Sequence, residues 1–194
     1  MVTTEQIKAL RDKTGASIGE CKKALEEAAG DMDKATKVLE KRLGGLAGKR
    51  TGRDTNEGVV DSYIHSNGKL GVLVELLSET DFVARNSDFR GLAHDISMHI
   101  AAAAPVYVSV EDVPVELVQE QKAAFTAEVA AMKKPADIAA NIVEGKLKSH
   151  FAAMALMSQP YVKDPNKTVG DVVREMIGKI GENIRVGRFT RFEL

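Results

Sequence analysis

The sequence predicts an α+β protein, in which a bundle of short helices precedes a small antiparallel sheet packed with helices. Three observations support this prediction. The first 44 residues contain three amphipathic segments with helix caps, residues 57–77 alternate as strands do, and most of the remainder repeats apolar residues at helical spacing. We therefore divide the chain into a three-helix bundle at 1–44, a linker at 45–56 and an α+β core at 57–194.

Helix caps delimit the three helices of the bundle. Each helix begins after a Ser, Thr or Asp residue, whose side-chain oxygen can accept a hydrogen bond from the free N–H groups of the first turn. Each is expected to end at glycine, which readily adopts the left-handed backbone that closes a helix. The expected caps are Thr3 or Thr4, Ser17 and Asp31, and the expected stops are Gly15, Gly30 and the Gly44–Gly45 pair.

A β-hairpin is predicted at the start of the core, because two alternating segments flank Asn67-Gly68, a pair typical of a type I′ turn. The last segment, "IRVGRFTRFEL", alternates in the same way and predicts a third strand. The apolar residues on one face of the hairpin are Leu70, Val72, Val74 and Leu76. About three short strands with one apolar face must be covered by helices or by another sheet, which makes a self-paired dimer physically reasonable.

Prolines mark the ends of the helices predicted in the rest of the core. The helix that follows residue 87 ends at Pro105. The next two helical segments are bounded by Pro114, Pro135 and Pro160, which indicates an antiparallel helical hairpin. One more helix is predicted in "TVGDVVREMIGKIGEN", directly before the last strand.

Composition narrows the classes of function. The chain has 194 residues, a formal net charge of −1 and a pI near 6.4, whereas nucleic-acid and anionic-membrane partners need a basic face. No window approaches the ~20 apolar residues of a membrane helix, and the N-terminal segment lacks targeting features. The single cysteine, Cys21, cannot form an internal disulfide and fits a reducing compartment. We therefore expect a cytoplasmic protein that binds neither nucleic acid nor membrane.

The sequence offers little support for an enzyme. His94 and His99 are separated by about 140° around a helix, so they cannot bind one metal ion together. Asp95 and His99 are spaced to pair on one helix; this predicts an exposed surface pair, with a small hydrolase as the alternative. Cys21 lies near the apolar positions of its helix and is interpreted as a packed small hydrophobic residue rather than a reactive thiol. We predict no catalytic residue, no metal site and no cofactor.

The stretch "TDFVARN", Thr80–Asn86, lies where the alternation of a strand gives way to helical spacing. Ser78-x-x-Asp81 fits a capping box and places Phe82 close to the start of the helix. Periodicity alone favours Phe82 as the first residue of a buried stripe. The alternative is that Val83 fills the core instead and the corner presents Phe82 rigidly at the surface.

The same stretch closely resembles the signature of elongation factor Ts, the bacterial and organellar nucleotide exchange factor for elongation factor Tu. Other segments resemble this family in the same order, including "LRDKTGASIGECKKALEEAAGDMDKA", "EGVVDSYIHSNGKLGVLVEL", "KPADIAANIVEGKLKSHF" and "QPYVKDPNKTVGDVV". The resemblance runs from about Ile7 to Leu194. It implies that the bundle is ubiquitin-associated-like and that the chain is a short form with one core subdomain, whose partner surface a homodimer would complete.

The resemblance also implies a binding site rather than a catalytic one. In the family, residues that match Thr80, Asp81, Phe82 and Val83 enter the GTPase domain of elongation factor Tu and dislodge its Mg²⁺, whose octahedral geometry tolerates little displacement. Ile18 matches the first of two bulky residues that contact the GTPase, and the second is glycine here. The alternative from a different class is a ubiquitin-associated-like adaptor, in which the bundle alone binds a ubiquitin-like protein.

Overall fold

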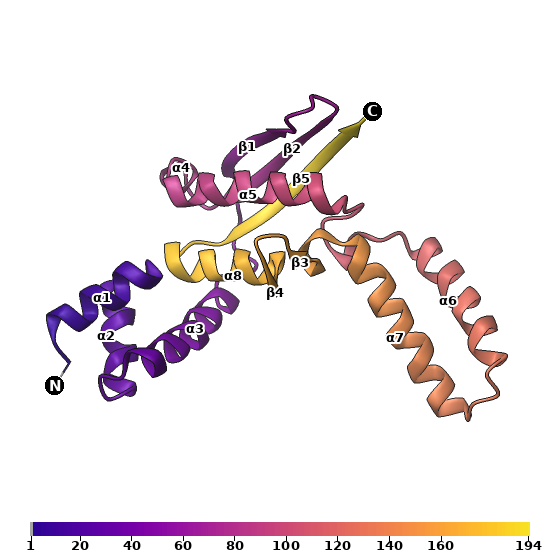
Figure 1. The fold of residues 1–194 in the computed structure, drawn as a ribbon, viewed down its shortest axis with the longest axis horizontal. Coiled ribbons are helices and arrows are strands. Elements are labelled where there is room, and N and C mark those ends of the chain that lie inside the picture. Colours follow the sequence, from indigo (N-terminus) through magenta and orange to yellow (C-terminus); the bar gives the residue numbers. More distant parts are fainter. Residues whose placement is uncertain (1) are drawn as a thin grey trace. The chain divides into compact units, whose positions relative to one another are not determined.

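The protein is described by a computed structural model that covers residues 2–194 (Figure 1). Its contacts form two compact units, each built from separate parts of the chain. Unit 1 contains the chain up to Asp61 together with Val74–Asp95 and Asp171–Gly187. Unit 2 contains Ser62–Leu73, Ile96–Gly170 and Arg188–Leu194.

Three helices form the N-terminal part of unit 1: α1 (Thr4–Thr14), α2 (Ile18–Glu27) and α3 (Met32–Gly48). The predicted caps are confirmed, because the side chains of Thr3, Ser17 and Asp31 each accept a hydrogen bond from an N–H group in the first turn. Cys21 is fully buried in the apolar core between these helices, which confirms its interpretation as a packing residue. The other buried core residues are Leu10, Ala16, Ala24, Leu25, Ala28, Ala35, Leu39 and Leu43.

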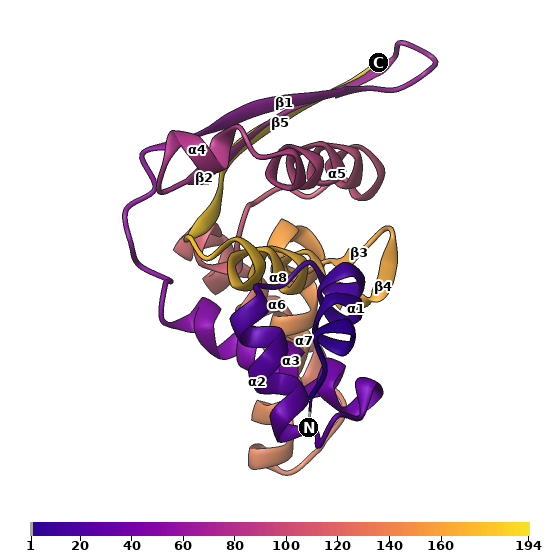
Figure 2. The same ribbon diagram turned by 90° about the vertical axis from the view of Figure 1, so that its left-hand side faces the viewer.

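The remaining elements combine helices with two small sheets. They are β1 (Glu57–Ile64), β2 (Leu70–Ser78), α4 (Asp81–Ala84), α5 (Ser87–Ala103), η1 (Val110–Asp112), α6 (Val115–Ala130), α7 (Ala136–Met154), η2 (Leu156–Ser158), β3 (Pro160–Tyr161), β4 (Asp164–Thr168), α8 (Val169–Ile180) and β5 (Ile184–Glu193). Strands β1, β2 and β5 form an antiparallel sheet in the order β1-β2-β5, and this mixture confirms the predicted α+β class. Figure 2 shows α5 along one face of this sheet.

Helix α3 does not stop at Gly44–Gly45, and that prediction is wrong. Leu43 and Ala47 are both buried and lie one turn apart on the same side of the helix. Gly178 of α8 approaches so closely that a Cβ atom placed on it would lie 2.7 Å from the Leu43 Cβ. This packing outweighs the poor helix propensity of two glycines, about 1 kcal/mol each, so α3 continues into the segment predicted as a linker.

The hairpin between β1 and β2 is present, but its turn is not the predicted type I′ turn. A type I′ turn needs a positive φ at both central residues. In this fully described loop Gly68 has a φ of 67°, but the φ of Asn67 is not positive. The Gly68 N–H donates to the carbonyl of His65 (2.8 Å), so the turn is centred on Ser66 and Asn67. The Asn67 side chain accepts the N–H of Lys69 (2.9 Å), which stabilises the longer loop.

The strand pattern of β2 is as predicted, with Val72, Val74 and Leu76 buried on one side. A second sheet, formed by β3 and β4, was not predicted. It pairs Pro160 with Thr168, and its strand β3 has only two residues, too few for alternation to be visible in the sequence.

Helices α6 and α7 form the antiparallel hairpin that the prolines indicated (Figure 1). Pro114 and Pro135 directly precede their first turns, where a missing N–H costs nothing. The ring of Phe125 in α6 meets the ring of His150 in α7 edge-on, with 5.8 Å between centroids. This contact holds the two helices side by side within unit 2.

Candidate partner-binding site

Phe82 projects from helix α4 into solvent. Its side chain is 81% exposed, whereas that of Val83 is 9% exposed and Ala84 is buried too. The periodicity-based interpretation of Phe82 as the first buried residue of a stripe is therefore wrong, and the stripe begins at Phe89, which is fully buried. The alternative interpretation, in which Val83 fills the core in place of Phe82, is confirmed.

Helix α4 is capped by Thr80 rather than by Ser78, so the predicted capping box is wrong. The Thr80 hydroxyl accepts the N–H of Val83 (3.4 Å), and its φ of −128° is extended, as a cap requires. Ser78 still belongs to β2 and is fully buried, and its hydroxyl donates to the Thr80 carbonyl (3.0 Å). Asp81 therefore occupies the first helical position, where its carboxylate also pairs with Arg85 (3.0 Å).

Two glutamates connect this strand-to-helix corner to the loop between α8 and β5. The Glu182 carboxylate accepts both the N–H (3.0 Å) and the hydroxyl (2.7 Å) of Thr80. In return, the Glu79 carboxylate accepts the N–H of Asn183 (2.6 Å). These bonds join segments that are 102 and 104 residues apart in the chain, so they fix the corner by tertiary rather than local contacts.

The ionised form of the Glu79 carboxyl is stabilised by its neighbours. The hydrogen bond from Asn183 N–H holds the pKa of the Glu79 carboxyl below its ordinary value of 4.5, and the Arg53 guanidinium, 3.3 Å away, acts in the same direction against the effect of burial. The Asn183 side chain donates to the carbonyl of Arg53 (2.7 Å). The segment before β1 is thus attached to the same loop.

Ile18, the second predicted contact, is the first residue of α2 and directly follows the cap Ser17. Its side chain is 57% exposed, although it is the most apolar residue at that end of the helix. Gly19 beside it has open space around the position of a Cβ atom. Ile18 and Phe82 are therefore both exposed apolar side chains of unit 1, on different elements.

The proposed Asp95–His99 pair is not an exposed surface pair, and that expectation is wrong. His99 is fully buried; its Nδ1 accepts the N–H of Val162 (3.2 Å) and its Nε2 donates to the Gln159 side-chain oxygen (3.0 Å). Burial lowers the pKa of the imidazole from its ordinary 6.5, against a smaller effect of Gln159. With both nitrogens engaged, this ring is a structural residue and gives the hydrolase alternative no general base.

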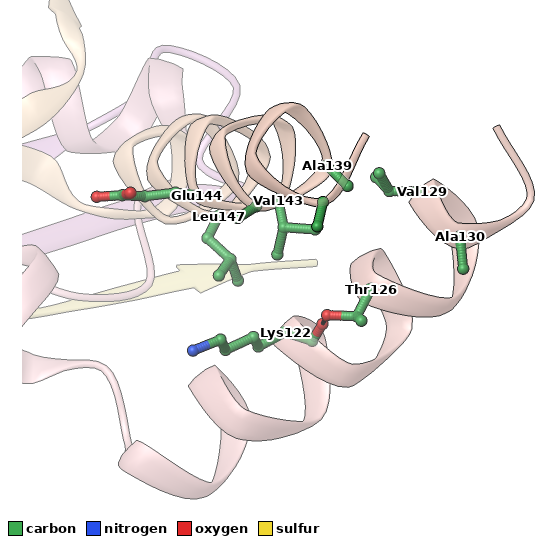
Figure 3. A pocket seen from close by; sticks show the side chains of 10 residues that line it. Lys122, Thr126, Val129, Ala130, Ala139, Val143, Glu144 and Leu147 are labelled. Carbon is green, nitrogen blue, oxygen red and sulfur yellow. Dashed lines mark hydrogen bonds between the residues drawn. The ribbon is translucent and has the colours of Figure 1, made fainter. Parts of the chain in front are cut away.

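Other features of the described residues concern metal ligands, membrane-spanning helices and pockets. Across residues 2–194, no three His, Cys, Asp or Glu side chains are grouped to hold a metal ion, and no helix is both long and apolar enough to cross a bilayer. An open, mainly apolar pocket of about 690 Å³ lies between α6 and α7 (Figure 3). The Thr126 hydroxyl in this pocket donates to the carbonyl of Lys122 (2.7 Å).

Comparison with known families decides the relationship. The family model described as Elongation factor TS matches residues 46–176. The chain belongs to the elongation factor Ts family. This confirms the resemblance detected in the sequence, and it identifies a translation elongation factor.

Relatives named Elongation factor Ts match this chain along its whole length. It is 50% identical over 193 residues to the one from Acetivibrio thermocellus, covering 100% of this chain and 90% of that relative. Identity is 47% with the proteins of Carboxydothermus hydrogenoformans and Thermotoga maritima, again over 100% of this chain and over 89% and 96% of theirs.

The sequence predicts Thr80–Val83 as the partner contact, but it gives no sign of the residues that hold this corner in the structure. Glu79, Glu182 and Asn183 are ordinary polar residues at loop positions, and nothing local distinguishes them. Their role depends on two loops that meet in space although about a hundred residues separate them in the chain. Pairwise covariation between positions 80 and 182 is the kind of signal that could have revealed the contact.

Proposed function

We propose that this elongation factor Ts is a guanine nucleotide exchange factor that binds elongation factor Tu in its GDP form and promotes GDP release. The observation that supports this most directly is the 81% exposure of Phe82 on a corner held by buried neighbours and hydrogen bonds. An aromatic side chain this exposed contributes little to its own fold. Its exposure suits a contact with another protein.

The proposed mechanism is displacement of the magnesium ion of elongation factor Tu. Mg²⁺ bridges phosphate oxygens of the nucleotide and protein ligands, and it requires near-ideal octahedral geometry. Phe82 enters the GTPase domain and shifts those ligands, while the Asp81 carboxylate engages polar groups beside it. Thr80 and Val83 orient the ring from behind. The factor itself then needs no catalytic acid, base, metal or cofactor, so it is not an enzyme.

Exchange follows from thermodynamic linkage. If binding of the factor weakens the affinity of the GTPase for GDP, then GDP weakens the affinity for the factor by the same ratio. The factor therefore binds the nucleotide-free GTPase most tightly and leaves when abundant GTP binds.

Further proposals concern domains and partners. The bundle predicted at 1–44, whose last helix α3 runs on to Gly48, is a ubiquitin-associated-like module whose Ile18 touches the GTPase. The rest of the predicted 45–56 segment is the linker, and 57–194 is the core that forms a homodimer. Exposed apolar side chains on the strands of unit 2, Ile64, Leu73 and Phe192, support the dimer. The expected protein partner is elongation factor Tu. We expect no nucleic-acid or membrane partner, and we expect the protein to act in the cytoplasm. Sedimentation of the protein with and without nucleotide-free elongation factor Tu tests both associations.

The decisive experiment is the rate of labelled GDP release from elongation factor Tu. The wild-type protein should accelerate release, and Phe82→Ala should remove most of the acceleration without unfolding the protein. Val162→Ala is a control, because Val162 is an exposed apolar residue of unit 2 whose hydrogen bond to His99 is made by its backbone N–H, which alanine retains. Unchanged GDP release in the presence of the wild-type protein would refute the function, and the adaptor alternative leaves the exposed Phe82 unexplained.

A further inference from the structure

The loop Gly181–Asn183 contacts two separate segments of unit 1, one at Glu79–Thr80 and the other at Arg53. The Glu182 carboxylate binds Thr80, the Asn183 N–H binds Glu79, and the Asn183 side chain binds the carbonyl of Arg53. We call this loop the clasp. Asn183 is buried and Glu182 is half-buried, so the clasp is part of the framework of unit 1 rather than a mobile tether.

The geometry at Glu182 is specific for a carboxylate. One oxygen accepts the Thr80 N–H (3.0 Å) and the other accepts the Thr80 hydroxyl (2.7 Å). A glutamine has the same shape but only one acceptor oxygen, since its amide nitrogen donates and cannot accept. Glutamine at this position can contact the Thr80 hydroxyl only by donating to it, so the hydroxyl proton loses its acceptor and the charge-assisted bond is lost.

The two bonds to Thr80 act on Phe82 through helix α4. The Thr80 hydroxyl that donates to Glu182 also accepts the N–H of Val83, so one oxygen atom links the clasp to the first helical turn. That helix has four residues, and a helix this short does not persist without outside contacts. The exposed ring of Phe82 has little packing of its own to set its direction.

We propose that Glu182 is a positioning residue for nucleotide exchange: it fixes the direction in which Phe82 leaves the surface, without touching the GTPase itself. This rests on the proposed exchange function. When a group must be positioned before a reaction, misplacing it lowers the reaction rate steeply: a displacement of 1 Å can cost on the order of 100-fold. Loss of the charge-assisted bond from the Thr80 hydroxyl should therefore lower the rate of exchange much more than it lowers the stability of the fold.

The first test measures the orientation of the side chain in the free protein. The chain contains no tryptophan, so Phe82→Trp introduces a single indole at the site. Time-resolved fluorescence anisotropy should show a restricted indole in Phe82→Trp and a clearly more mobile one when Glu182→Gln is added. Equal anisotropy decays in the two proteins would overturn the inference, whatever the exchange activity.

The second test measures GDP release from elongation factor Tu at saturating factor. Glu182→Gln should lower the maximal rate by about tenfold or more while the half-saturating concentration changes little. In the Phe82→Ala background the same change should have no further effect, because Glu182 acts through the ring. Glu128→Gln is the control: it removes a glutamate that pairs with Lys146 in the helical hairpin, and it should leave exchange unchanged.

The outcomes separate the two proposals. If Phe82→Ala abolishes exchange but Glu182→Gln does not lower it, the positioning role is overturned and the exchange function stands. If Glu182→Gln lowers exchange equally in both backgrounds, Glu182 acts independently of Phe82 and the inference also fails. If the wild-type protein does not accelerate GDP release, both proposals fail. Thermal unfolding of each variant verifies that the comparison is made between folded proteins.

Discussion

Phe82 and Val83 are adjacent in the chain, yet the first side chain is 81% exposed and the second is 9% exposed. Successive residues of a helix point about 100° apart, so a single turn is enough to separate them. Val83 anchors helix α4 to the interior of unit 1, and Phe82 is left outside. Packing within the protein thus uses Val83, and the proposed partner contact uses Phe82 of the same turn.

Substitutions at these two positions should have opposite profiles. Phe82→Ala should change the free energy of unfolding by less than about 0.5 kcal/mol, because an exposed side chain is removed. Val83→Ala should lower it by about 1–2 kcal/mol, because buried methyl groups are lost. Urea denaturation of both variants measures this. A larger loss for Phe82→Ala than for Val83→Ala would mean that the ring packs against its own chain.

Two glycine-to-alanine changes test the course of helix α3 and its contact with α8. Gly44 is exposed inside α3 with open space around it, so Gly44→Ala should raise stability by about 0.5–1 kcal/mol. Gly178→Ala should lower stability by about 1–3 kcal/mol, because the new Cβ would meet the Leu43 backbone, with its carbonyl oxygen at 3.0 Å. Thermal unfolding compares them. Destabilisation by Gly44→Ala would indicate that α3 stops where the sequence suggested.

Stability should fall as pH drops below about 6.5, because of His99. Its pKa is lower in the folded protein than its ordinary 6.5, so below that pH the unfolded chain takes up the proton first and is favoured. The slope can reach about 1.4 kcal/mol per pH unit for one group. The lowered pKa of Glu79 acts only below its ordinary 4.5, in a separate range.

Urea unfolding between pH 7.5 and 5 measures this effect. His99→Gln should be less stable overall but should lose the dependence on pH within that range. If the variant retains the slope of the wild-type protein, another group is responsible.

Cys21 should be almost unreactive in the folded protein. The thiol is fully buried, and burial raises its pKa above the ordinary 9.0, so little of the reactive thiolate forms. Alkylation by iodoacetamide should be at least about tenfold slower in the native protein than in urea, because it waits for opening of the bundle. The control is Lys22→Cys in a Cys21→Ala background, since the Lys22 side chain is largely exposed. Rapid alkylation of the native wild-type thiol would contradict its burial.

Features governed by neighbouring residues could be predicted from the sequence. The caps at Thr3, Ser17 and Asp31 depend on contacts within three residues of each cap. The buried side of β2 follows from strict alternation, and the hairpin of α6 and α7 follows from the prolines that delimit it. In each case the physical cause lies within one element, so local pattern was sufficient.

Some of the errors have a common cause, which is packing from a distant part of the chain. Gly44–Gly45 would end an isolated helix, but contact of Leu43 with Gly178 keeps this one intact. Helical period placed Phe82 in the core, because period alone cannot show that Val83 already fills the available space. The support for Phe82 by Glu182 was likewise invisible, since it exists only after the chain has folded.

The separation of 102 residues between Thr80 and Glu182 has a consequence for the protein during its own synthesis. At about 5–20 residues per second, the corner that bears Phe82 leaves the ribosome roughly 5–20 s before the glutamate that holds it. A nascent chain would thus expose an aromatic ring without its support throughout that interval. The hydrogen bonds between Thr80 and Glu182 can form only when a nearly complete polypeptide has left the ribosome. Truncated products that lack Glu182 should therefore lack a correctly oriented Phe82 ring.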